Sequence, residues 1–404
     1  MVKGIEVAVP AILVLMVIGI LIGLWIAAGV VPLMIVFGLK MLSPEIFLPA
    51  CCLISALVSL ATGSSWTTAG TVGVALIGVA TGLGIDLGMA AGAIISGAYF
   101  GDKMSPLSDT TNLAPAVAGS ELFEHIRHMV FTTGPSFLIA LGLFVLLGFS
   151  SAAPDGADAA SVTSIVSSLE EIFNLSPLLW LPPGLVLLMV FLRVPALPAM
   201  LSAAALGGVL AMLLQDSFTL PDVLDAALGG YQQVTGNETV DQLLSDGGGG
   251  RGGMDNMFWT ISLVLCAMVF GGVMERTGML ATIGGAILSL ARGTGSLIAS
   301  TAATCFGMNA LSSDQYLSIV VPGRMFRDAY EERGLAAKNL SRVLEDAGTI
   351  TSPLIGWNTC AAAMAGSLGV ATGQYWMFCF FNLINPLVSV LLGFTGWTIA
   401  KRTD

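Results

Sequence analysis

Residues 105–119 read Ser105-Pro-Leu-Ser-Asp-Thr-Thr-Asn-Leu-Ala-Pro-Ala-Val-Ala-Gly119, and residues 352–366 read Ser352-Pro-Leu-Ile-Gly-Trp-Asn-Thr-Cys-Ala-Ala-Ala-Met-Ala-Gly366. The two stretches align without gaps and share Ser-Pro-Leu, three alanines and the closing glycine. Proline removes a backbone donor and breaks a helix, so each stretch predicts a polar interruption within an apolar segment. The same broken helix is therefore expected twice in the chain.

The composition of the chain places it in lipid. Of its 404 residues, 55% are hydrophobic and only 10% are charged, which is too little polar surface for a water-soluble globule of this size. Backbone in lipid must satisfy its own hydrogen bonds, and no alternating pattern supports a barrel. We therefore expect an all-α polytopic protein of the prokaryotic cytoplasmic membrane. The six cysteines lie in apolar segments and are expected to be small core residues.

Two further landmarks repeat. Gly23–Gly29 and Gly272–Gly278 have the same spacing in two apolar stretches, and the polar run Gly63–Thr68 corresponds in position to Gly307–Asp314. Residues 7–119 and 257–370 are therefore predicted to be homologous halves. The predicted division is 1–119 as repeat 1, 120–215 as connecting helices, 216–256 as an acidic extracytoplasmic loop, 257–370 as repeat 2 and 371–404 as the C-terminal helix. Helices are predicted at 7–26, 28–41, 131–150, 176–193, 196–215 and 374–397, with polar-interrupted segments at 45–84 and 86–118.

The basic residues predict that the two repeats are inverted. Repeat 2 carries Arg324–Arg342 after its first break, where repeat 1 carries no basic residue; after the second break the bias reverses, with Arg127 in repeat 1. Equivalent loops then face opposite sides of the membrane, and binding sites lie near the midplane where broken helices meet. This topology also places Lys3, Lys40, Arg193, Arg276, Lys401 and Arg402 in the cytoplasm. Both acidic loops are then outside, with Arg292 as the exception, and Asp246–Gly253 is expected to be a flexible linker.

Polar side chains gather at the four predicted breaks. Ionisable groups inside a membrane are costly, so each is a functional hypothesis, and Na⁺, like other hard cations, prefers oxygen ligands. The candidate ion- or substrate-binding residues are Ser64, Ser65, Thr67, Asp102, Ser105, Asp109, Thr110, Asn112, Ser312, Asp314, Asp346, Thr351, Ser352 and Asn358. Among them, Asp109, Asn112 and Asp314 are the candidate Na⁺ ligands.

Structural alternatives stand beside these assignments. Any single hydroxyl can bond to a carbonyl of its own helix, and Asp102 can pair with Lys103 or Arg127. His125 and His128 could sense cytoplasmic pH, although interfacial packing is favoured. Asp109 aligns with Gly356, so the backbone motif does not require an acid there. We therefore hypothesise that Asp109 exchanges H⁺ for Na⁺, with Asp314 or Asp346 as the next candidates.

At these residues the sequence closely resembles the NhaC family of sodium/proton antiporters, within a wider ion-transporter superfamily. The matching segments are Thr62–Gly73, Gly101–Gly119, Ser313–Ser318 with Pro322–Arg324, and Glu345–Leu354 with Trp357 and Asn358. The resemblance implies two re-entrant hairpins and two unwound helices that move against a scaffold, which often dimerises.

The resemblance also implies where Na⁺ binds. One sodium site would be framed by Ser64, Ser65 and Thr67 with Asp109–Asn112, and its mate by Ser312–Asp314 with Thr351, Ser352 and Asn358. Family members usually begin with two further helices. Since the helices at 176–215 lack a counterpart before repeat 1, we expect the native gene to encode two helices upstream of Met1.

The expected function is exchange of Na⁺ for H⁺ by alternating access, without a cofactor and with Na⁺ as the transported ion. The alternative is Na⁺/H⁺-coupled exchange of a small carboxylate such as malate or lactate, or of an amino acid. A passive channel is disfavoured because paired inverted breaks are typical of alternating access. An enzyme is disfavoured because the sequence has no nucleophile–base pair, phosphate loop or metal-ligand cluster. The expected partners are the bilayer, Na⁺ and H⁺, with a homodimer as a further option and no nucleic acid.

Overall fold

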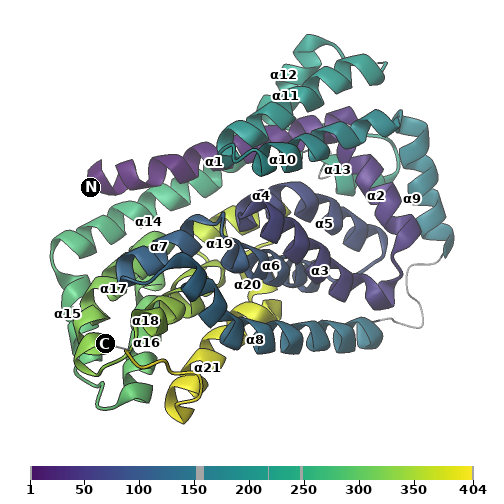
Figure 1. Cartoon of the computed structure of the whole chain (residues 1–404). Coiled ribbons are helices and arrows are strands. Elements are labelled where there is room, and N and C mark those ends of the chain that lie inside the picture. The colour runs from purple at the N-terminus through teal and green to yellow at the C-terminus, as the bar shows by residue number, and fades with distance from the viewer. Residues whose placement is uncertain (1, 152–158, 217, 246–248, 403–404) are drawn as a thin grey trace.

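The computed structural model describes residues 2–151, 159–216, 218–245 and 249–402 (Figure 1). Within these ranges the regular structure is helical, with two isolated β-bridges and no strand. Five of the described helices are long and apolar enough to cross a membrane, or seven spans if each of two bent helix pairs counts as one. The prediction of an all-α polytopic membrane protein is confirmed.

The chain bends at a glycine directly after the first candidate span, Ala8–Ala28. α1 (Val2–Ala28) and α2 (Val30–Met41) are joined by Gly29, whose φ of 88° lies in the left-handed region that glycine adopts without steric cost. Gly278, with φ of 75°, takes the same place between α14 (Phe258–Arg276) and α15 (Met279–Leu288). In Figure 1, α2 follows α1 at the end away from the N-terminus. Residues Ala8–Ala28 of α1 are long and apolar enough to cross a membrane by themselves, and α2 is a shorter apolar helix.

The remaining elements follow in three groups. The first half continues with α3 (Pro44–Thr62), α4 (Ser65–Thr68), the π-helix η1 (Ala69–Gly73), α5 (Val74–Gly82), α6 (Leu87–Met104) and α7 (Asp109–Ala118). The connecting region contains α8 (Leu122–Ser151), α9 (Ala159–Ile172), η2 (Pro177–Trp180), α10 (Leu181–Phe191), α11 (Ala196–Leu214), α12 (Leu220–Gly229), α13 (Glu238–Ser245) and η3 (Asp255–Met257). After α14 and α15 come α16 (Thr294–Ser312), α17 (Gln315–Glu332), α18 (Ala337–Val343), the π-helix η4 (Leu344–Thr349), η5 (Ser352–Leu354), α19 (Thr359–Leu368), α20 (Thr372–Tyr375), η6 (Trp376–Phe378) and α21 (Phe380–Thr395).

Element boundaries in the two halves recur with a constant offset of 250 residues. Adding 250 to the bounds of α3 gives those of α16, and adding it to the bounds of α7 gives those of α19. The continuous stretch from α4 to α5 (65–82) likewise becomes α17 (315–332). The left-handed residues that end these helices match as well, in the pairs Gly63 and Ser313, Gly84 and Gly334, and Gly119 and Gly369.

This offset corrects the register of the sequence alignment. Pairing residues 105–119 with 352–366 requires an offset of 247, which is three residues short. The reason is that Ser352–Leu354 forms the 3₁₀ turn that corresponds to the last turn of α6, whereas Ser105 already lies beyond that turn, at the C-cap of α6. The structural counterpart of Asp109 is therefore Thr359, not Gly356.

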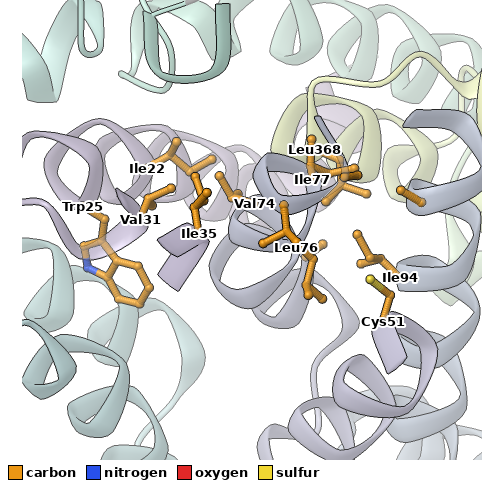
Figure 2. Close-up of a cluster of buried hydrophobic side chains, with 14 of the residues drawn as sticks. Ile22, Trp25, Val31, Ile35, Cys51, Val74, Leu76, Ile77, Ile94 and Leu368 are labelled. Atoms are coloured by element: carbon orange, nitrogen blue, oxygen red, sulfur yellow. The ribbon is translucent and has the colours of Figure 1, made fainter. Parts of the chain in front are cut away.

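The two halves interlock through their second broken helices. α7 of the first half packs against α17, α18 and η4, and α19 of the second half packs against η1, α4 and α5. Figure 2 shows part of the shared core, where Val31 and Ile35 of α2 approach Val74, Leu76 and Ile77 of α5, with Leu368 of α19 beside them. Each half thus completes the core of the other.

Two contacts correct the predicted sidedness. The Lys40 ammonium lies 2.6 Å from a carboxylate oxygen of Glu170. Glu170 in turn lines one cavity with Asp216 of the next acidic segment, so Lys40 lies with the acidic loops and not with the cytoplasmic residues. Conversely, Arg333 donates to the carbonyl of Ala291 at 2.6 Å, which places Arg292 beside the predicted cytoplasmic cluster. Basic-residue counting fails at Lys40 because an acidic partner from a distant segment holds it.

The expected flexible linker is partly a packed element. Residues 246–248 lie outside the described residues, but Gly253 donates its backbone N–H to the carbonyl of Gly19 on α1 at 2.6 Å. A Cβ on Gly19 would lie 2.4 Å from the Gly253 carbonyl oxygen, so only glycines let the two backbones approach this closely. This part of the segment therefore packs against α1, and its flexibility stays a prediction.

Candidate functional site

The first break of repeat 1 is tied to α6 by Asp102. α3 ends at Gly63 in the left-handed conformation, and Ser64 caps α4 by accepting from the Thr67 backbone N–H at 3.2 Å. Ser65 donates to one carboxylate oxygen of Asp102 through its backbone N–H at 3.0 Å and its hydroxyl at 2.7 Å. Asp102 is buried, and it lies in the last turn of α6, which packs along the whole of α3. Two charge-assisted donors thus hold a carboxylate at a helix break inside the protein.

The turn between α6 and α7 has an inner and an outer side. Ser105 and Thr110 are buried, and the Thr110 hydroxyl lies 3.2 Å from that of Ser108, the cap of α7. Asp109 and Asn112, by contrast, are exposed. The Asn112 amide donates to the carbonyls of Pro106 and Ser108 at 2.9 and 2.7 Å. The desolvation on which the Asp109 hypothesis depends is therefore not found, and Asp102 is the buried acid of this turn.

The breaks of repeat 2 meet in an amide-centred cluster. The side chain of Asn358 donates to the backbone and side-chain oxygens of Asn309, both at 3.1 Å, while Asn309 donates to the Thr351 hydroxyl at 3.0 Å. Ser313, the counterpart of Gly63, has φ of 60°, a left-handed conformation that is strained for serine. Its hydroxyl is buried without a hydrogen-bond partner in the described structure.

The other predicted residues of repeat 2 act mainly as local caps. Asp314 caps α17 by accepting from the Leu317 backbone N–H at 2.9 Å. Ser312 and Ser352 donate to carbonyls of their own helical segments, as the alternative assignment for single hydroxyls expects. The Ser352 hydroxyl also lies 3.5 Å from the Tyr99 hydroxyl of α6, which connects the two halves. The two predicted sites are therefore neighbouring clusters, and their role in binding Na⁺ stays a prediction.

A buried ion pair, which the sequence analysis did not predict, joins the halves. Lys103 of α6 pairs with Asp346 of η4, and both side chains are fully buried. Asp346 also accepts from the Thr132 hydroxyl at 2.9 Å and the Asn385 amide at 3.0 Å, and Arg342 approaches it to 3.9 Å. Lys103 is thus not the partner of Asp102, which corrects that alternative.

The sequence indicated that Lys103 and Asp346 each need an oppositely charged partner, but it did not indicate which residue that partner is. A lysine and an aspartate inside apolar helices must each find an opposite charge, which the cost of burying an unpaired ion predicts. The residues are 243 positions apart, so their pairing follows only from the packing of η4 between α16, α17 and α21.

The two histidines of α8 face α18. The His125 imidazole lies 2.8 Å from the Ser341 hydroxyl, and that of His128 lies 3.2 Å from the Asn339 side-chain oxygen. Both side chains are buried, so they pack between helices and are not exposed at the cytoplasmic surface. Five of the six cysteines are buried and Cys266 is exposed, which confirms the core assignment except at Cys266.

The described residues contain no group of three acidic, histidine or cysteine side chains that could hold a metal ion. The available oxygen ligands are instead single carboxylates with hydroxyls and carbonyls at broken helices. Such a set suits a monovalent cation that must bind and leave, because few charged ligands mean modest affinity.

Comparison with known proteins gives a consistent result. A family model described as the Na⁺/H⁺ antiporter family matches residues 97–397. The chain is 40% identical over 402 residues to the Na⁺/H⁺ antiporter NhaC of Alkalihalophilus pseudofirmus, covering 100% of this chain and 85% of that protein. It is 38% identical to the arginine/ornithine antiporter ArcD of Halobacterium salinarum, with 99% of this chain and 81% of that protein covered. It is also 34% identical to the malate-2H⁺/Na⁺-lactate antiporter of Bacillus subtilis, with 98% and 83% covered. With a matching family model over most of the chain and these helices, the chain is a multi-pass transporter of the cell membrane and belongs to the Na⁺/H⁺ antiporter family.

Proposed function

We propose that this chain exchanges Na⁺ for H⁺ across the cell membrane by alternating access, and that Asp102 is the carboxylate that binds Na⁺. It acts as a transporter and not as an enzyme, needs no cofactor, and carries Na⁺ as its cargo. The observation that supports this most directly is the pair of hydrogen bonds from Ser65 to Asp102 at the first helix break. The 40% identity to a named Na⁺/H⁺ antiporter supports the choice of ions.

The geometry supports Asp102 because the three other candidate aspartates are exposed or already engaged. Asp109 is exposed, Asp314 caps α17, and Asp346 is held by Lys103. When Na⁺ enters, the Ser65 hydroxyl can rotate its hydrogen away and offer its oxygen beside the carboxylate. The Gly63 carbonyl lies in the unwound turn between α3 and α4 and is a further candidate oxygen ligand, whereas the Ser64 carbonyl already accepts from the Thr68 backbone N–H at 3.2 Å.

The test is Na⁺-induced pH change in proteoliposomes, measured together with ²²Na⁺ uptake. In wild-type protein, Na⁺ that moves down its gradient should drive protons across the membrane in the opposite direction. Asp102→Asn should lose both fluxes, because it keeps the side-chain shape but not the charge, while its thermal stability in detergent shows that it folds. Full exchange by folded Asp102→Asn would reject the site, and absence of Na⁺-dependent proton flux in wild type would reject the function.

A second cargo is supported by the relatives. An arginine/ornithine antiporter and a malate–lactate antiporter match nearly the whole chain at 38% and 34% identity. Malate, lactate and arginine should therefore be added in separate assays. Acceleration of ²²Na⁺ flux by one of them would favour coupled exchange of that solute. The homodimer implied by the resemblance belongs to the same proposal, and light scattering of the purified protein tests it.

A further inference from the structure

Glu345 is a fully buried acid that the proposed Na⁺ site does not use. It lies in the π-helix η4, and its side chain has no exposed surface. Neither carboxylate oxygen has a hydrogen-bond partner in the described structure, and no ion pair among the described residues includes it. Buried polar groups are nearly always partnered, so an acid of this kind needs an explanation.

The helical packing does not explain it. With the offset of 250 residues, the counterpart of Glu345 in the first half is Ile95, which is also fully buried. The same backbone position is thus filled by an aliphatic side chain in the half that carries Asp102. A π-helix, moreover, displaces one residue from the regular helical pattern, and such segments occur frequently at functional sites.

The surroundings of Glu345 can be named element by element. On α6, the charges of Asp102 and Lys103 act on it, and on α16 it acts on Cys305. The charge of Arg342 on α18 acts on Tyr330 of α17, and Arg342 and Lys103 both approach Asp346. α7 offers the nearby Thr110 hydroxyl, η4 offers that of Thr349, and α21 carries no titratable side chain. Neither hydroxyl reaches hydrogen-bonding geometry with Glu345.

We propose that Glu345 carries the exchanged proton, while Na⁺ binds separately at Asp102. A buried carboxylate without donors is much more costly than a carboxylic acid, so the geometry around Glu345 suits the protonated form. Lys103 does not relieve this cost by contact, because its ammonium is bound to Asp346. The inference rests on the proposed Na⁺/H⁺ exchange and assigns the two ions of that exchange to different residues.

Electrostatics then couples the two ions. When Asp102 is charged and free of Na⁺, its negative charge favours retention of the proton on Glu345. When Na⁺ neutralises Asp102, the repulsion between the two carboxylates is removed. Glu345 then releases its proton to water, so the total charge of Asp102, Glu345 and their bound ions stays the same. Interaction between two charges is strong in a buried, low-dielectric site, so no direct contact between the two acids is needed.

The experiment measures proton release on Na⁺ binding to the purified full-length protein in weakly buffered detergent solution. Wild type should release protons when Na⁺ is added. Glu345→Gln should still bind ²²Na⁺ but release no protons. Glu332→Gln is the matched control, since this glutamate ends α17 at an exposed position, and it should behave like wild type.

The possible outcomes separate this inference from the proposed function. If wild type binds no Na⁺, both fail; if Glu345→Gln releases protons as wild type does, only the assignment of Glu345 fails. Should Glu345→Gln not fold, Glu345→Asp keeps an acid at the same position. A shifted pH midpoint of proton release in Glu345→Asp supports the proposal, and an unchanged midpoint overturns it.

Discussion

The buried ion pair between Lys103 and Asp346 leads to a prediction about single residues. Removing one partner leaves an uncompensated charge in the protein interior, which costs roughly 3–5 kcal/mol in comparable pairs. Lys103→Met and Asp346→Asn should therefore each lower the stability of the protein strongly. The double variant should recover part of the loss because it buries no unpaired charge from this pair. Thermal unfolding in detergent measures the effect, and additive losses in the double variant would contradict the pairing.

Asp241 predicts a pH dependence in the acidic loop. Hydrogen bonds from Thr235, first from its hydroxyl and then from its backbone N–H, together with the Gly236 N–H, hold the pKa of Asp241 below its usual value. A depressed pKa stabilises the folded loop above the unfolded pKa of about 3.8, and this stability is lost as pH falls through the lower folded value. The protection factors of the amides at residues 231–245, which compare each exchange rate with the intrinsic rate at the same pH, should therefore fall in acid in wild type. In Asp241→Asn these protection factors should be low already at neutral pH and change little with pH, and equal pH profiles of the protection factors would contradict this role.

At the level of helices, the contact between α3 and α6 depends on two glycines. A Cβ on Gly97 would lie 2.1 Å from the Cys52 carbonyl oxygen, and one on Gly101 would lie 2.4 Å from that of Ala56. Both obstacles are backbone atoms, so the helices would have to separate. Gly97→Ala should destabilise the protein by about 1–3 kcal/mol, the usual cost of overpacking. It should also impair transport, because Asp102 lies on α6 and its partner Ser65 lies at the break that follows α3.

A matched control is available on α8. A Cβ on Gly142 would meet no atom within 4 Å, so Gly142→Ala should leave thermal stability and transport close to wild type. Equal stability of Gly97→Ala and Gly142→Ala in detergent would show that α3 and α6 do not approach each other as closely as the structure has them.

At the scale of the whole molecule, the contacts of Lys40 and Arg292 predict their sidedness. With Lys40 paired to Glu170 and Arg292 beside Arg333, we expect Lys40→Cys to face the outside and Arg292→Cys the cytoplasm. The background should carry Cys266→Ser, since Cys266 is the exposed native cysteine. An impermeant thiol reagent added to intact cells should label Lys40→Cys alone. Labelling of both positions, or of Arg292→Cys alone, would contradict this topology.

The same topology affects the interpretation of the two halves. Lys40 precedes α3 and Arg292 precedes α16, which are counterparts under the offset of 250 residues. Equivalent loops on opposite sides are what inverted repeats require. The labelling experiment therefore also tests the predicted inversion and the proposed division into repeats 1–119 and 257–370.

The sequence by itself determined the features that depend on local chemistry. Low charge and long apolar segments required helices in lipid, and Gly63, Pro106 and the hydroxyls around them identified the breaks. Only the tertiary structure decided which polar groups meet, because Ser65 and Asp102, or Lys103 and Asp346, are brought together by helix packing between distant segments. It also decided burial: Asp102 and Asp109 lie on one short stretch of sequence, yet one side chain is buried and the other exposed. Local sequence does not contain this difference, since it depends on which neighbouring helix covers each face.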